Sequence, residues 1–143
     1  MKPDAGSTQR QFVHRAQVFI GRSTHSKTIA LQLYRLRSCV EHMNDYTAEL
    51  KDIASSKDAA EQLAQRRSLQ AGLLATHIYR HILGTPELFR LFSDETTIQE
   101  FWATPDHEQD QTWNASPIDL ETAANEILDP FGVHGINKNP QHQ

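Results

Sequence analysis

The chain is 143 residues long, which is enough for one domain and leaves little room for a second. Its single cysteine excludes an internal disulfide, and no apolar stretch approaches the ~20 residues that a membrane-spanning helix needs. Because the sequence also shows no basic-then-apolar leader, we expect a cytoplasmic protein with no membrane partner. A chain exported without a classical leader would show the same pattern and is an open alternative.

Charge and proline divide the chain into two parts. Residues 1–90 hold 13 of the 14 Lys and Arg but 8 of the 18 Asp and Glu, whereas residues 91–143 hold one Lys and ten acids. Five of the six prolines also follow Thr85. This predicts a single helical domain, with disordered residues before it and a flexible tail after it. The predicted bounds are 1–7 (disordered lead), 8–84 (basic helical body) and 85–129 (acidic short-helix segment) within the domain 8–129, and 130–143 (tail).

The first helix is predicted to begin at Thr8, because Thr8 and Gln11 have the spacing of a capping box. Apolar residues then recur on one face as far as Gly21, a typical residue at a helix end. The pattern indicates a short amphipathic helix.

In two longer stretches that follow, apolar residues recur at alternating intervals of four and three residues. We call each such row of residues, which would lie along one face of a helix, a seam. The first predicts one helix of roughly 29 residues over 24–54, and the second predicts a helix that Ser55 or Ser56 caps and that reaches Gly84. The first seam is Ile29, Leu33, Leu36, Val40, Met43, Thr47, Leu50 and Ala54, and the second is Ala60, Ala64, Arg67, Ala71, Leu74, Ile78 and His81.

The small residues of the second seam would let the two helices approach closely, and the connection between them is short. We therefore predict an all-α fold, a helical bundle built on a long antiparallel helical hairpin, with a short N-terminal helix before it. A heptad seam can also pair between chains, so a homo-oligomer through this seam is an open alternative.

Two or three short C-terminal helices are predicted after the hairpin. Pro86 follows a threonine and precedes an acid, which is a start signal for a helix over 85–92. A second helix is predicted to begin at Ser93 or Asp94 and to end before Thr104, followed by a polar loop over 106–116 and a last helix over 117–128.

Two histidines, His77 and His81, are four residues apart and would share one face of a helix, as a pair of metal ligands does. No third ligand is evident, since His42 is predicted to point away from the hairpin. We favour a structural pair, and metal binding or a metal-dependent enzyme at these residues is our third functional hypothesis. Other catalytic motifs are missing, so we expect no enzyme and no cofactor.

Basic side chains dominate the first helices, with no acid between Ala5 and Val40. A surface of this sign attracts phosphate, although these residues do not form one stripe and no nucleic-acid-binding motif is present. A nucleic-acid-associated regulator is therefore the second hypothesis. Its candidate residues are Arg10, Arg15, Arg22, Lys27, Arg35 and Arg37.

Large apolar residues gather in the acidic segment, where most must pack in a core but some can anchor a partner. The leading hypothesis is a non-enzymatic adaptor, chaperone-like or regulatory protein that binds another protein through the hairpin face or this segment. Its candidate residues are Leu88, Phe89, Phe92, Phe101, Trp102 and Trp113, the last on a predicted loop.

The charge division also has an internal explanation. Arginines are scattered over the long helices, and acids lie on the short helices that follow. We expect the acidic segment to fold back over the basic body, although its last helix could equally dock in the groove of a partner.

Overall fold

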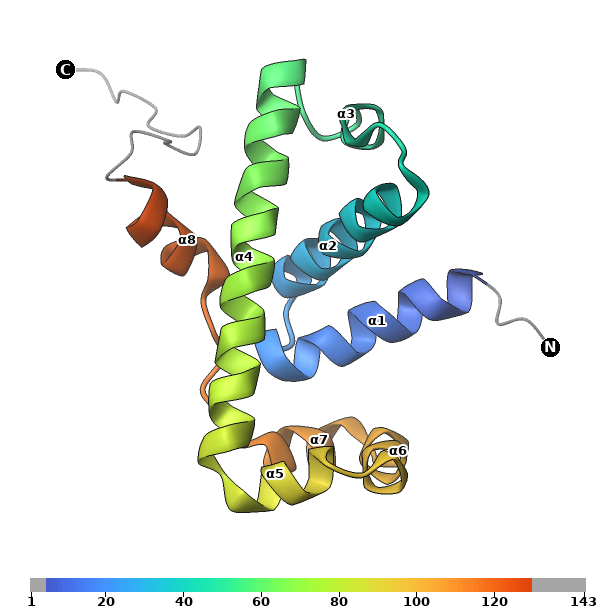
Figure 1. Cartoon of the computed structure of the whole chain (residues 1–143), viewed down its shortest axis with the longest axis vertical. Coiled ribbons are helices and arrows are strands. Elements are labelled where there is room, and N and C mark those ends of the chain that lie inside the picture. The colour runs from blue at the N-terminus through green and yellow to red at the C-terminus, as the bar shows by residue number, and fades with distance from the viewer. Residues whose placement is uncertain (1–4, 130–143) are drawn as a thin grey trace.

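The computed structural model describes residues 5–129, and in this range the chain forms eight helices and no strand. The predicted all-α class is therefore confirmed. None of the described helices combines the length and the apolar character that crossing a bilayer requires. Residues 1–4 and the predicted tail 130–143 lie outside the described residues. The bounds are α1 (Ala5–Ile20), α2 (Thr24–His42), α3 (Tyr46–Glu49), α4 (Lys57–Gly84), α5 (Pro86–Phe92), α6 (Glu95–Ala103), α7 (Asp106–Trp113) and α8 (Leu120–Leu128) (Figure 1).

α1 and α2 pack against each other through apolar faces on one side of α4 (Figure 1). α1 begins at Ala5, so Thr8 lies inside the helix and the predicted capping box does not mark its start. The turn between the two helices depends on Gly21, whose φ of +102° is unfavourable for other residues. A Cβ there would also lie 3.0 Å from the Cβ of Pro117. The pair's buried residues are Val13, Ala16, Ile20, Ile29 and Ala30.

α2 ends before Met43, so the single helix predicted over 24–54 is wrong. Met43 has a left-handed backbone conformation (φ 52°, ψ 33°). Its N–H donates to the carbonyl of Val40 at 3.3 Å, and the N–H of Asn44 donates to the carbonyl of Cys39 at 2.9 Å. These two bonds form the Schellman arrangement that closes many helices, although glycine usually occupies the position of Met43.

The one-turn helix α3 follows this break and is held by polar contacts. Asp45 accepts a hydrogen bond from the N–H of Thr47 at 2.9 Å, an interaction by which short acidic side chains compete with a continuing helix. Arg35 of α2 donates to the carbonyl of Glu49 at 2.7 Å, and Leu50 is fully buried. The heptad spacing therefore continues in the sequence past Met43 although α2 ends there, because Leu50 is buried from the separate turn that follows.

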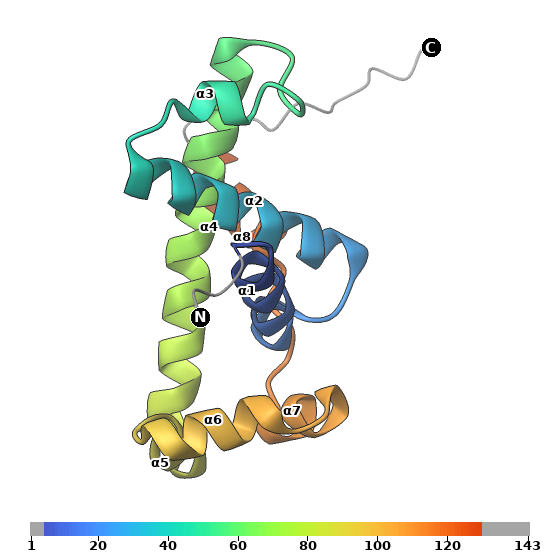
Figure 2. The ribbon, with the colours of Figure 1, turned by 90° about the vertical axis from the view of Figure 1, so that its right-hand side faces the viewer.

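α4 confirms the second predicted long helix. Its first turn is capped by Ser56, whose Oγ accepts a hydrogen bond from the N–H of Ala59 at 3.1 Å. α2 crosses α4 obliquely in both views and does not run alongside it (Figures 1 and 2). The predicted long antiparallel hairpin is therefore not confirmed, since one of its arms is shorter than expected and diverges from the other.

Four short helices follow α4 where two or three were predicted, because the expected loop 106–116 contains α7. α7 places Asp106 and Glu108 in its first turn, where the helix dipole favours acids. Gln109 and Trp113 lie four residues apart on one face, and both are buried. α5, α6 and α7 cluster at the C-terminal end of α4 (Figure 2), and α8 returns along the side of α4 opposite to α2 (Figure 1).

We expect Met43→Gly to stabilise the fold by about 0.5–1 kcal/mol. Glycine removes the roughly 1–2 kcal/mol cost of a left-handed backbone at a residue with a Cβ, and its own folding entropy offsets part of this gain. Urea denaturation measures the change. As a control, Ala75→Gly in the exposed interior of α4 should destabilise by about 1 kcal/mol. Destabilisation by both substitutions would contradict the left-handed cap.

Candidate functional site

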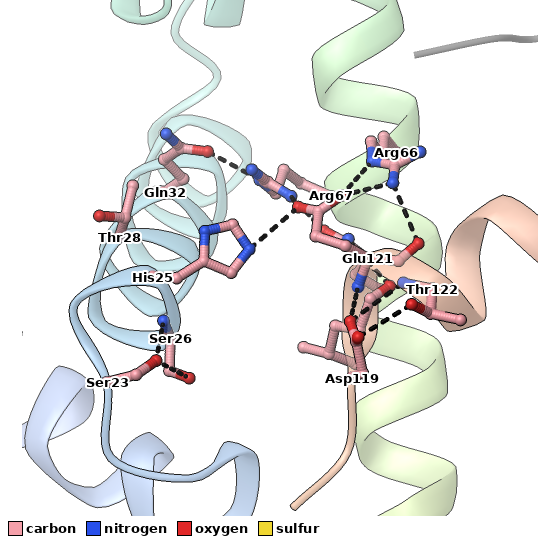
Figure 3. Close-up of polar contacts among 12 residues, drawn as sticks. Ser23, His25, Ser26, Thr28, Gln32, Arg66, Arg67, Asp119, Glu121 and Thr122 are labelled. Atoms are coloured by element: carbon pink, nitrogen blue, oxygen red, sulfur yellow. Dashed lines mark hydrogen bonds and ion pairs between the residues drawn. The ribbon is translucent and has the colours of Figure 1, made fainter. Parts of the chain in front are cut away.

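A charged network joins α8 to α4, and Glu121 lies at its centre (Figure 3). Its Oε2 accepts a hydrogen bond from Arg66 Nε at 2.7 Å, and its Oε1 accepts one from Arg67 Nη1 at 2.7 Å. The carboxylate thus bridges two consecutive arginines of α4. Asp119 fixes the start of α8, because its Oδ1 accepts hydrogen bonds from the backbone of Glu121 and Thr122 at 3.1 and 3.0 Å.

Arg67 extends this network to α2. Its side chain is buried, and its Nε donates to Oε1 of Gln32 at 2.7 Å. Its Nη1 also donates to Gln70, which is itself fully buried and donates to the carbonyl of Leu120 at 3.1 Å. One arginine side chain therefore connects α2, α4 and α8.

The protonation state of Glu121 reflects these contacts. Burial alone would raise the pKa of this carboxyl, but hydrogen bonds from Arg67 and Arg66 and the charge of Arg67 outweigh burial and lower its pKa from 4.5 to about 2. Glu121 is therefore ionised at neutral pH, and the network is an ion pair between the acidic segment and the basic body.

An apolar groove of about 630 Å³ opens beside Arg67, between the diverging part of α2 and the middle of α4. One wall is the predicted seam of α2, and the floor is the small-residue seam of α4. Phe12 of α1 closes one end and Tyr46 of α3 the other. The wall residues are Leu33, Leu36, Cys39, Val40 and Met43, and the floor residues are Ala64, Ser68, Ala71, Leu74, Ala75 and Ile78.

Several apolar side chains that line the groove are exposed. Val40 is 79% exposed and Met43 is 95% exposed, and on the floor Ala71 and Ala75 are exposed too. A contiguous apolar patch rimmed by polar residues is typical of a binding surface.

The aromatic residues proposed as partner anchors mostly form a second core. Leu88, Phe101 and Trp113 are buried, and Phe92 and Trp102 are packed against them. Trp113 lies on α7 and makes an edge-on contact with Phe19 of α1 at 4.7 Å between ring centroids. The predicted loop is therefore wrong at Trp113, which is buried on a helix. Of this candidate set, Phe89 alone is exposed, at 51%.

The proposed phosphate-binding cations are mostly engaged within the chain. Arg22 Nε lies 2.9 Å from Oδ2 of Asp110 on α7, and Arg15 lies over the ring of Trp102, 5.1 Å from its centroid. Arg35 pairs with Glu49 and Asp52, and Arg37 with Glu41. Arg10 and Lys27 lie together around a hollow between α1 and α2. Among these contacts, the pair of Arg22 and Asp110 joins the basic body to the acidic segment as the charge division predicts, whereas the acids that pair with Arg35 and Arg37 belong to the basic body itself.

The histidine pair has neighbours that fit a structural role. His81 Nε2 lies 2.5 Å from the carbonyl oxygen of Trp113, and the two rings stack edge-on. Burial, together with the nearby His81, lowers the pKa of His77 below its usual 6.5. Within residues 5–129, no three His, Cys, Asp or Glu side chains come together as metal ligands would.

The chain matches no family model, no curated protein and no solved structure at a significant level. The groove is thus a candidate binding site by its geometry alone.

Both seams that line the groove were visible in the sequence as heptad patterns, but their residues were expected to cover each other. The Glu121 network had no sequence signal, because its partners lie more than fifty residues apart.

We expect Glu121→Gln to lower stability at neutral pH by about 1–3 kcal/mol, because it leaves two arginines without their counter-charge. The lowered pKa means that the native ion pair contributes fully above about pH 4.5 and is lost as pH falls toward 2. The stability difference between the wild type and the variant should therefore shrink over that interval.

Thermal unfolding between pH 7 and pH 2 measures this difference. Glu126→Gln, at an exposed acid of the same helix, is the matched control and should change little at any pH. A difference between the wild type and Glu121→Gln that stays constant down to pH 2 would show that Glu121 is not the titrating group.

Proposed function

We propose that this protein is a non-enzymatic interaction module of the adaptor or regulatory kind, and that it receives an amphipathic α-helix in the groove between α2 and α4. The observation that carries the proposal is the exposure of the α2 seam beside the small-residue floor of α4. Two apolar seams with a gap between them are two sides of a helix-packing site from which a third helix is missing.

The side chains of the groove fit a helix. Ala64, Ala71 and Ala75 present only methyl groups, so the backbone of an incoming helix can approach α4 closely. Val40 and Met43 on the opposite wall are three residues apart and can contact successive turns of that helix. The partner we expect carries large apolar residues in four-residue and three-residue steps, which fill the space above the alanines.

Met43 gives this proposal independent support. It is an almost fully exposed apolar side chain, and its left-handed backbone would favour glycine. Both features cost stability in the free protein, and strained positions are concentrated at binding sites. Methionine is also a flexible, polarisable side chain that adapts to the shape of a bound helix. A contact with a partner explains why this position holds methionine.

The aromatic segment is a less suitable docking surface. Its large side chains fill the core between α1 and α5–α7, so exposing them to a partner would require that core to open. Each buried aromatic contributes about 1.5–3 kcal/mol by its burial. The groove, in contrast, is open without any rearrangement.

A photo-reactive residue placed at position 71 of the full chain, expressed in its native host, tests the proposal. Position 71 is exposed on the groove floor, so a bound helix should give a cross-linked product. Met43→Glu should abolish the product, because it places a charge in the apolar interface. Ile127→Glu, a charge at an exposed apolar residue of α8, should leave it unchanged.

Circular dichroism should show that both variants are folded, since both residues are exposed in the free protein. The absence of any protein adduct at position 71, or an adduct that Met43→Glu leaves intact, would reject the groove as a docking site.

A further inference from the structure

The groove and the ridge beside it lie on one face of the molecule. Val40 and Met43 form the ridge, because they stand exposed along the end of α2, and Ala71 and Ala75 form the floor next to them. A surface can pair with an identical surface about a two-fold axis only if it contains both halves of the contact. This face does so, since it offers large side chains and, beside them, room for large side chains.

We propose that the helix received by the groove is α2 of a second copy of this chain, so that the protein is a symmetric dimer. This inference rests on the proposed function, because it names the occupant of the same groove. Each copy would place its ridge against the floor of the other. The heptad spacing of the α2 seam supports this occupant, since it is the spacing by which like helices pair.

The charges that flank the ridge fit an antiparallel pairing of the two α2 helices. Arg37 and Glu41 lie one turn apart on either side of Val40, and within one copy they form an exposed ion pair. Two antiparallel helices that cross near Val40 bring Arg37 of each copy toward Glu41 of the other. Exchanging the two exposed intrachain pairs, one in each copy, for two reciprocal pairs costs little and fixes the register.

The apolar area on this face supplies a substantial part of what a dimer requires. At roughly 200 Å² for a large apolar side chain, the exposed fractions of Val40, Met43 and Tyr46, which line the groove, together amount to about 400 Å². The groove walls and the alanines add to this. A standard stable interface buries about 800 Å² on each partner.

Sedimentation velocity of the purified full chain over a range of concentrations tests the inference. We expect a dimer that dissociates on dilution. Val40→Glu and Met43→Glu should each weaken dimerisation by about tenfold or more, because a charge would be buried in the apolar contact without a partner. Ile127→Glu should remain as dimeric as the wild type, and circular dichroism should show that all variants are folded.

The outcomes separate this inference from the proposed function. A wild-type chain that is monomeric at every concentration would overturn the dimer, and so would a dimer that survives both groove substitutions. If such a monomer still forms a Met43-dependent adduct at position 71 with a different protein, the docking function stands and the occupant is that protein. If it forms no adduct, both proposals fail.

Discussion

The arrangement of the long helices depends on one carboxylate, Glu121, held between two consecutive arginines of α4. A charge that is partly removed from water needs a counter-charge, and here each arginine supplies one to the same acid. Because Arg67 also bonds Gln32, the position of α8 on one side of α4 and the position of α2 on the other are set together. The acidic segment therefore does more than neutralise the basic body, since it fixes where α2 meets α4.

The groove follows from where α2 is attached to α4. α2 is held near its middle by the bond between Gln32 and Arg67, and one turn further on Arg35 bonds to α3. Beyond these contacts α2 diverges from α4, and no element within residues 5–129 fills the space. The width of the groove is thus set by polar contacts, while its lining is apolar. Such a site keeps its shape when empty, which reduces the entropy lost when a helix binds.

Local signals in the sequence predicted the elements better than their packing. Ser56 and Pro86 marked real helix starts, and the spacing of the second seam defined α4. The break at Met43 could not be found in this way, because Leu50 continues the heptad pattern from a different turn. α7 was missed since its polar composition hides the buried face of Gln109 and Trp113. For the site, both seams were recognised, but whether they cover each other depends on the direction of α2, which tertiary contacts decide.

The end of α2 gives the clearest reason to assign a function to the groove. Had the helix continued over 24–54 as its apolar spacing allows, its seam could have covered α4 within the chain and the groove would be closed. The chain instead ends the helix at a position that favours glycine, and places there a methionine that is 95% exposed. Neither feature benefits the isolated fold. In the proposed complex, burial of the Met43 side chain under another helix would offset the cost of both features.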